Sequence, residues 1–152
     1  MNDLFQSWAG ERCDSVKQIS ANGSNRQYYR LTGATHQCIA AVNGDVRENE
    51  AFFYYAKELR ARGLRVPEVY AVSDDRTMYL QQDLGDTTLY AYLTAKRQAG
   101  EEVRQEMSDI YHRVIDDLVL MQTRGRDLDF SHAYPRADFD RQSIQWDLNY
   151  YK

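Results

Sequence analysis

A small polar loop containing one glycine separates two strand-like runs near the start of the chain. The loop reads Ser20-Ala21-Asn22-Gly23-Ser24-Asn25-Arg26, and the runs on either side cover 15–20 and 27–33. Two such runs joined by a short loop of this composition predict a β-hairpin. Small residues let backbone N–H groups approach a phosphate closely, and the Ser24 hydroxyl can add a donor. Ordinary turns share this composition, so the loop indicates a phosphate site only in combination with the segments downstream of it.

The pattern after the loop predicts a third strand, a helix and two further strands. Only one helix interrupts the strands, so crossover connections of the βαβ kind are not expected elsewhere. An antiparallel sheet with one packed helix is the natural arrangement for this order. The sequence therefore predicts an α+β fold with an antiparallel five-stranded sheet. The expected strands cover 15–20, 27–33, 36–43, 68–72 and 77–81.

The packed helix is expected over residues 47–62. Asn43-Gly44-Asp45 supplies a turn and an N-cap immediately before it. Apolar residues then recur at helical spacing. Phe52, Tyr55 and Leu59 are expected to form its buried stripe.

The character of the chain changes after Gln82-Asp83-Leu84-Gly85-Asp86. We expect a first lobe over 1–82, a hinge over 83–86 and the helical start of a second, incomplete lobe over 87–152. The aromatic-rich final helix reaches Lys152 without a capping residue, which predicts a chain that has been cut short. Helices are expected over 2–9, 89–93 and 101–123, and from 137 onward.

Composition narrows the classes of partner. The net charge is −4 and no basic run occurs, so nucleic acid and anionic membranes are not expected partners. No apolar stretch approaches the length of a membrane span, and the first residues do not open a signal peptide. Cys13 and Cys38 lack the spacing of a metal or redox motif, which favours two reduced cysteines in a cytoplasmic protein.

Four segments occur in an order that is informative as a set. They are Gly23-Ser24-Asn25-Arg26-Gln27-Tyr28-Tyr29-Arg30-Leu31, Glu48-Asn49-Glu50-Ala51-Phe52, Gly63-Leu64-Arg65-Val66-Pro67-Glu68-Val69-Tyr70-Ala71 and Tyr79-Leu80-Gln81-Gln82-Asp83-Leu84-Gly85-Asp86. With them the chain resembles the aminoglycoside phosphotransferase / choline kinase-like family, which has a protein-kinase-like fold. Within that family it looks most similar to bacterial anomeric sugar kinases acting on N-acetylmuramate and N-acetylglucosamine. The resemblance covers nearly the whole chain, including Trp146-Asp147-Leu148-Asn149-Tyr150.

The resemblance implies transfer of the γ-phosphoryl group of ATP, with Mg²⁺, to a hydroxyl of a sugar, an amino sugar or an aminoglycoside-like molecule. It assigns Ser24 and the backbone of Asn25 to the β-phosphate. Glu50 would be the helix glutamate that positions the phosphate-binding strand, with Glu48 as the alternative. A solvated charge at the start of a helix is the structural alternative for Glu50.

The resemblance also implies a site for the adenine base. The backbone C=O of Gln81 and the N–H of Asp83 would pair with the edge of the base. The apolar slot would be lined by Ile39, Ala41, Val69 and Leu80. These four residues can equally belong to the core, and the two interpretations do not exclude each other.

Two departures from the family pattern affect function. The kinase pattern places a lysine on the third strand to hold the α- and β-phosphates, whereas Ala41-Val42-Asn43 stands there. Arg26 or Arg30 is the candidate substitute. No catalytic aspartate run or metal aspartate follows the helices, so no catalytic or metal residue is assigned. Because phosphoryl transfer depends on positioning and electrostatics, we expect an inactive fragment that binds ATP weakly or not at all.

Two other interpretations stay open. The chain can be a non-catalytic interaction module built on a kinase N-lobe, or an unrelated α+β domain. Trp146, Leu148, Tyr150 and Tyr151 predict a self-association surface on the final helices, which would give a homo-oligomer. The alternative is that this segment folds back onto the long helix and leaves a monomer.

Overall fold

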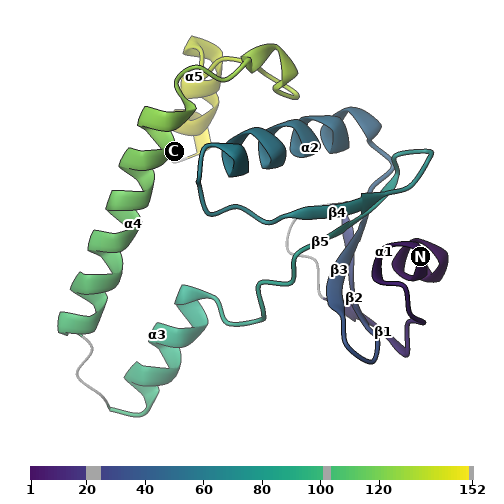
Figure 1. Ribbon diagram of the computed structural model, residues 1–152. Coiled ribbons are helices and arrows are strands. Elements are labelled where there is room, and N and C mark those ends of the chain that lie inside the picture. The colour runs from purple at the N-terminus through teal and green to yellow at the C-terminus, as the bar shows by residue number, and fades with distance from the viewer. Residues whose placement is uncertain (20–24, 101–103, 151–152) are drawn as a thin grey trace.

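A five-stranded antiparallel sheet forms the centre of the first half of the chain (Figure 1). The computed structural model describes residues 1–19, 25–100 and 104–150. The spatial strand order is β1-β2-β3-β5-β4, and every neighbouring pair is antiparallel. The expected α+β fold and its sheet are therefore confirmed. The strands are β1 (Ser15–Ile19), β2 (Gln27–Thr32), β3 (Gln37–Val42), β4 (Val69–Val72) and β5 (Met78–Gln81).

Helices flank the sheet and make up the second half of the chain. α3 continues five residues beyond the expected end at 93, because Ala95, Lys96 and Arg97 are strong helix formers. α5 begins at 141 rather than 137, where the Asp140 carboxylate accepts a hydrogen bond from Ser143 N–H at 2.9 Å and caps the first turn. The bounds are α1 (Asn2–Ala9), α2 (Val46–Ala61), α3 (Leu89–Gln98), α4 (Arg104–Gly125), the 3₁₀ helix η1 (Phe130–His132) and α5 (Arg141–Tyr150).

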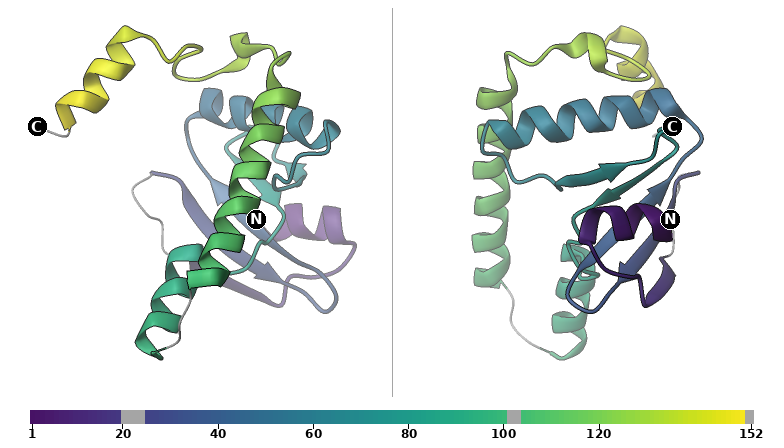
Figure 2. Two further views of the ribbon diagram at one scale, coloured as in Figure 1. Left: turned by 90° about the vertical axis from the view of Figure 1, so that its left-hand side faces the viewer. Right: turned by 45° about the vertical axis from the view of Figure 1, so that its right-hand side comes forward.

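α1 covers one face of the sheet (Figure 2). Its Phe5 is fully buried among side chains from β2, β3 and β5. Trp8 stacks on Tyr70 of β4, with ring centroids 4.5 Å apart. The sequence does not predict this packing, and it gives the sheet its main core. The strand residues of that core are Leu31, Cys38, Ala40 and Leu80.

α2 covers the opposite face. Neighbouring residues of a strand point to opposite faces, so Tyr79 points away from α1 while Leu80 points toward it. The Tyr79 ring meets Phe52 and Phe53 of α2 at centroid distances of 5.2 and 5.0 Å. Tyr79 is the largest fully buried side chain in the described part of the protein.

The buried stripe of α2 differs from the one expected. Asn49, Ala51 and Ala56 are the buried residues of the helix, whereas the expected set of Phe52, Tyr55 and Leu59 is only half-buried. Short side chains let the helix approach the sheet closely. Tyr55 and Leu59 instead border a groove shared with α4 and η1.

A buried asparagine, Asn49, fixes the start of α2. The Asn49 Nδ2 group donates to the Asn43 carbonyl at 2.9 Å and to the Arg76 carbonyl at 2.8 Å. It thereby joins the β3–α2 turn to the β4–β5 turn. Asp45 caps the same helix end by accepting from the N–H groups of Arg47 and Glu48.

The helices after the sheet contact α2 mainly through α4 and η1 (Figure 1). Arg124 Nη1 donates to the Arg62 carbonyl at 3.1 Å, and Arg65 pairs with Asp117. His132 of η1 stacks on Tyr54 with ring centroids 3.9 Å apart, which gives this histidine a packing role. Among the described helices, none is long and apolar enough to cross a membrane.

The difference in burial between Leu80 and Leu59 predicts a difference in the stability of their alanine variants. Replacing Leu80 with Ala removes a fully buried side chain from the α1 face and should cost about 2–5 kcal/mol. Leu59→Ala should cost clearly less, because Leu59 is only half-buried. Urea denaturation of both variants checks this, and an equal loss for the two would contradict the assignment of the core.

Candidate functional site

A hollow of about 190 Å³ lies on the α2 face of the sheet, where β1, β2, β3 and β5 meet the segment after β5. Pockets that enclose a whole drug-sized ligand measure roughly 300–1,000 Å³. The hollow is smaller than that range, so it has room for only part of a ligand, such as one flat ring system. Its walls are Ile19, Tyr28, Arg30, Ile39, Gln81, Gln82, Asp83, Leu84, Gly85 and Asp86.

An ion-pair network closes the hinge side of the hollow. Arg30 of β2 donates through Nε and Nη2 to the two Asp83 oxygens at 2.5 and 3.0 Å. It also donates through Nη1 and Nη2 to Asp86 at 2.7 and 2.8 Å. Gln37 Nε2 adds a bond to Asp83 at 2.6 Å. We call Arg30, Asp83 and Asp86 the hinge clamp.

The two acids of the clamp have different environments. The Asp83 side chain is 8% exposed, whereas that of Asp86 is 69% exposed. The hydrogen bonds from Arg30 hold the pKa of Asp83 below its usual range, and the same guanidinium lowers the pKa of Asp86. The acids raise the pKa of Arg30 in turn. Both carboxylates therefore stay ionised at neutral pH.

The backbone beyond the sheet offers donors to a ligand. Gln82 N–H still donates to the Glu68 carbonyl at 2.8 Å, beside β4. Among the described residues, no acceptor meets the N–H groups of Asp83 and Leu84. The Asp83 side chain accepts from Gly85 N–H at 2.9 Å and so bends the segment into its turn.

Three of the residues assigned to the base lie at the hollow. Ile39, Gln81 and Asp83 all line it. Gln81, however, is still a strand residue, paired with Ile39 on one side and with Val69 on the other. Its backbone therefore lies within the ladder, and the first backbone groups beyond the sheet come later in the chain.

The other three apolar residues of the expected slot lie apart from the hollow. Leu80 belongs to the core beneath α1, on the opposite face of the sheet, which corrects its expected position beside Ile39. Ala41 is buried between Tyr28 and Tyr79 in the register of the sheet. Val69 borders a separate hollow beneath the second half of α2.

A second polar cluster joins the start of β2 to the start of α2. Arg26 Nη2 lies 3.1 Å from Glu48 Oε1, and its guanidinium packs over the rings of Phe52 and Tyr79. Asn43 Nδ2 donates to the other Glu48 oxygen at 2.7 Å. The glutamate of α2 that faces the sheet is therefore Glu48.

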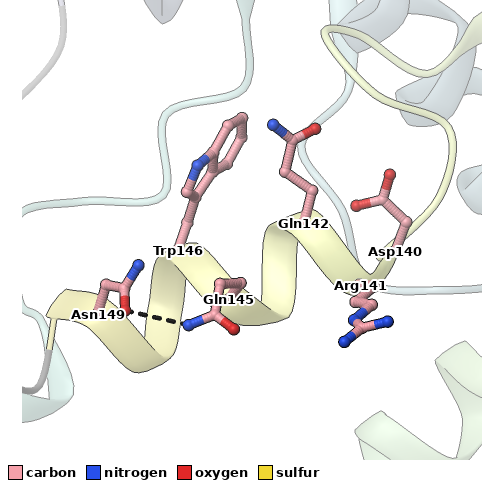
Figure 3. A pocket seen from close by; sticks show the side chains of 6 residues that line it. All are labelled: Asp140, Arg141, Gln142, Gln145, Trp146 and Asn149. Carbon is pink, nitrogen blue, oxygen red and sulfur yellow. Dashed lines mark hydrogen bonds between the residues drawn. The ribbon is translucent and has the colours of Figure 1, made fainter.

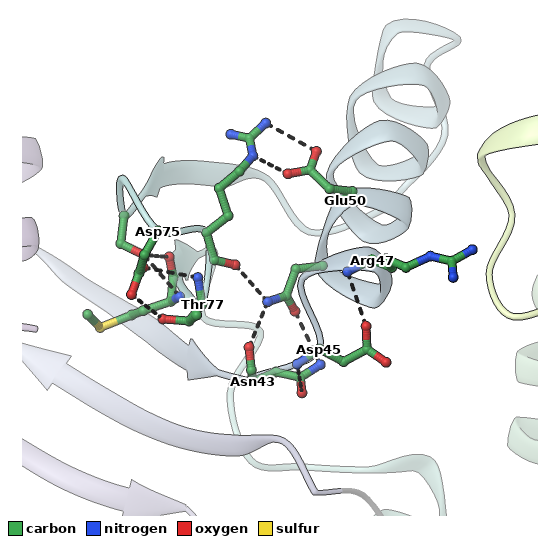
Figure 4. Close-up of polar contacts among 10 residues, drawn as sticks. Asn43, Asp45, Arg47, Glu50, Asp75 and Thr77 are labelled. Atoms are coloured by element: carbon green, nitrogen blue, oxygen red, sulfur yellow. Dashed lines mark hydrogen bonds and ion pairs between the residues drawn. The ribbon is translucent and has the colours of Figure 1, made fainter.

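Glu50, the first choice from the sequence, points elsewhere. It pairs with Arg76 of the β4–β5 turn (Figure 4). Asn25 is exposed, and Ser24 lies outside the described residues. The role of either residue toward a phosphate stays a prediction.

Another hollow lies far from these clusters along the chain. It is formed by α5 and by Asp140 directly before it, and Gln145 Nε2 donates there to Asn149 Oδ1 at 3.1 Å (Figure 3). Trp146 stands at its edge, and no side chain of the sheet contributes to it. Across residues 1–19, 25–100 and 104–150, no group of three acidic, histidine or cysteine side chains is placed to hold a metal ion.

The arrangement defines a class of protein. An antiparallel five-stranded sheet with one helix between β3 and β4, whose glutamate faces the sheet, is an α+β arrangement consistent with the N-lobe of a protein-kinase-like fold. The model of the phosphotransferase enzyme family matches residues 15–152, so the chain belongs to that family. No curated protein matches the chain.

Sequence reasoning misses the hinge clamp and the role of Asn43. Arg30 and Asp83 are 53 positions apart, and no local pattern connects them. The available signal is the unusual density of acids after β5 together with an arginine in mid-strand. In the sequence Asn43 is visible only as part of a turn, although its buried side chain contacts both Glu48 and Asn49.

The lowered pKa of Asp83 in the hinge clamp predicts how the stability of the protein depends on pH. A depressed aspartate pKa contributes stability above the ordinary value of about 3.9, and this contribution is lost as the pH falls through the lower folded value. Asp83→Asn should cost roughly 1.5–3 kcal/mol at pH 7 and should flatten the acid limb of the stability curve. Asp86→Asn, at an exposed position, is the matched control and should change stability little. Equal effects of the two substitutions would contradict the burial difference.

The buried hydroxyl of Tyr79 predicts that its removal does not destabilise the protein. Within the described part of the chain, the Tyr79 hydroxyl is buried without a hydrogen-bond partner. Leaving such a group unsatisfied is costly. Tyr79→Phe should therefore be at least as stable as the natural protein, and more stable by about 1 kcal/mol if no water reaches the hydroxyl. A thermal unfolding scan measures this, and a clear loss of stability would indicate a partner for the hydroxyl.

Proposed function

We propose that this chain is the ATP-binding lobe of a small-molecule phosphotransferase that acts on a hydroxyl of a sugar, an amino sugar or an aminoglycoside-like compound. The single observation that carries the proposal is the hollow between the sheet and the hinge, in a chain of the phosphotransferase enzyme family. ATP with Mg²⁺ is the phosphoryl donor that this family implies. A sugar acceptor and a cytoplasmic location rest on the resemblance alone.

The walls of the hollow suit an adenine ring. Ile19 and Ile39 supply apolar contact to a flat base, and the Tyr28 ring borders the same space. The N–H groups of Asp83 and Leu84, directly after the sheet, are the backbone donors proposed for the edge of the base. The hinge clamp fixes the peptide that carries them, so that the donors are already positioned before a ligand arrives.

The proposal is limited to binding. The sequence contains no run with a catalytic aspartate and a metal aspartate after the helices. These groups place the acceptor hydroxyl and the metal ion in phosphoryl transfer. We therefore propose weak ATP binding and no turnover by these 152 residues.

Titration of the ¹⁵N-labelled protein with adenosine tests the base site. The amide signals of Gln81, Asp83 and Leu84 should shift in a saturable way. Ile19→Trp fills the hollow and should abolish these shifts. The matched control is Val16→Trp on the same strand, because Val16 points to the other face and is exposed. Shifts that survive Ile19→Trp, or that appear elsewhere on the protein, would refute the proposed base site.

A second candidate function is favoured by the exposed stripe of α4. Tyr111, Val114, Ile115 and Leu118 recur at helical spacing, and each is about half exposed. Such a stripe supports an interaction module that pairs with a second copy of this chain, together with the exposed Trp146 and Tyr150 of α5.

Light scattering at micromolar concentration tests this candidate. A dimer should dissociate when Ile115 and Leu118 are replaced by Ser. Replacing Trp146 and Tyr150 by Ser tests the contribution of α5, and Asp116→Ser next to the stripe is the control. A monomer whose mass is the same in all variants would dispose of self-association.

A further inference from the structure

A second space on the α2 face of the sheet lies between the later part of α2 and the start of β4. Its volume is about 310 Å³. This is at the lower end of the range of pockets that enclose a whole small ligand. We call this space the α2 hollow. Its walls are Phe53, Ala56, Lys57, Arg60, Ala61, Glu68 and Val69.

The α2 hollow is separate from the hollow at the hinge. In the register of the sheet Val69 lies opposite Gln81, and Gln81 lies opposite Ile39. Directly opposite residues of neighbouring strands share a face, so all three belong to the α2 side. Ile39 and Gln81 border the hinge hollow, whereas Val69 borders the α2 hollow. The two spaces therefore lie along one row of the sheet, and no described residue lines both.

Short side chains leave the α2 hollow open, and an apolar surface borders it. Ala56 and Ala61 both line it from the helix, and Ala56 is itself buried against the sheet. Phe53 and Val69 add the larger apolar contacts. The Phe53 ring packs edge-on against Tyr79, with ring centroids 5.0 Å apart. The apolar part of the space is thus formed before any ligand arrives, which lowers the cost of binding.

Charged side chains form the rim of the α2 hollow. Arg60 Nη2 donates to Glu68 Oε2 at 2.8 Å, and both side chains are about half exposed. Lys57 lies on the same side of the helix, one turn before Arg60. Within the described part of the chain, no acid pairs with Lys57. Two cations and one acid leave a single positive charge on the rim, and Lys57 carries it.

These two parts of the hollow define the ligand that fits it. An apolar body is needed to cover the alanines, the phenylalanine and the valine, and a single negative charge is needed to meet the ammonium group. A lysine can lay its hydrocarbon stem along such a surface and keep its charged end at the rim. A doubly charged group such as a phosphate ester suits the space less well, because the Glu68 carboxylate stands on the same rim and repels it.

We propose that the α2 hollow binds a small monocarboxylate with a flat apolar body, and that the carboxylate pairs with Lys57. The apolar body lies against Phe53 and Val69. This site goes beyond the nucleotide function and does not depend on it, because it uses neither the hinge nor a phosphate.

Titration of the ¹⁵N-labelled protein with benzoate tests the site, and benzamide serves as the neutral ligand of the same shape. Benzoate should shift the amide signals of Phe53, Lys57 and Val69 in a saturable way. The dissociation constant should lie in the millimolar range, as expected of so small a ligand. Benzamide should bind roughly fivefold more weakly, because an ion pair at an exposed rim contributes modestly.

Three variants separate the charge from the apolar contact. Lys57→Gln should lower the affinity for benzoate to that for benzamide and leave benzamide binding unchanged; Lys57 is exposed, so the variant should fold. Ala61→Leu places a larger side chain in the hollow and should abolish the binding of both ligands. Arg47→Gln is the matched control. It removes a cation of the same helix about 15 Å along the axis from Lys57 and should change neither affinity.

Each result decides for or against the site. The absence of any saturable shift with benzoate would refute it. Equal affinities for benzoate and benzamide, or benzoate binding that is unchanged in Lys57→Gln, would refute the ion pair that defines the ligand class. Shifts of Asp83 and Leu84 in place of those in α2 would put benzoate at the hinge hollow and would equally overturn the proposal.

Discussion

The alternation of side chains along β5 is the constraint on which the rest of this protein depends. Successive residues must point to opposite faces, and β5 uses this to serve two cores. Leu80 completes the apolar cluster around Phe5, while Tyr79 meets the aromatic rings of α2. With one face packed under α1, the other is left to α2 and to the hollow. The candidate site exists because the main core lies on the face that the site does not use.

The hinge clamp fixes the position of the chain segment that follows the sheet. An arginine in the middle of a strand brings a charge close to the core, and such a charge is tolerated only when it is paired and hydrogen-bonded. Arg30 meets that condition through its bonds to Asp83 and Asp86. Gln37 and Gly85 donate further hydrogen bonds to the Asp83 carboxylate. Long side chains lose entropy when they are fixed, but here one arginine orders two acids of the same short segment. The segment after β5 is thus held by charge, since Leu84 within it is exposed.

The sequence predicts the order of elements and the antiparallel sheet because periodicity and turn residues are local signals. The sequence-based prediction is wrong where the outcome depends on which face of a strand or helix a side chain points to. As an apolar neighbour of the hinge, Leu80 is expected in the slot, although a strand residue adjacent to Gln81 must point to the other face. Glu48 and Glu50 are two positions apart on a helix, which separates them by about 200°. Only one of them can face the sheet, and the choice depends on where Asp45 starts the helix. Asn49, Ala51 and Ala56 are buried on α2 because small side chains allow close approach, and hydrophobicity alone does not show this.

The polar cluster at Glu48 connects the sheet to α2 although β3 carries no lysine. Glu48 lies between the neutral amide of Asn43, in the β3–α2 turn, and the guanidinium of Arg26, at the start of β2. The largely buried Arg26 guanidinium also packs over the rings of Phe52 and Tyr79. The cluster therefore couples the helix to the strand. Arg26 directly precedes β2, so any movement of α2 that displaces Glu48 acts on the same strand that supplies Tyr28 to the hollow and Arg30 to the hinge clamp. The helix, the hollow and the hinge clamp are therefore connected through a single strand.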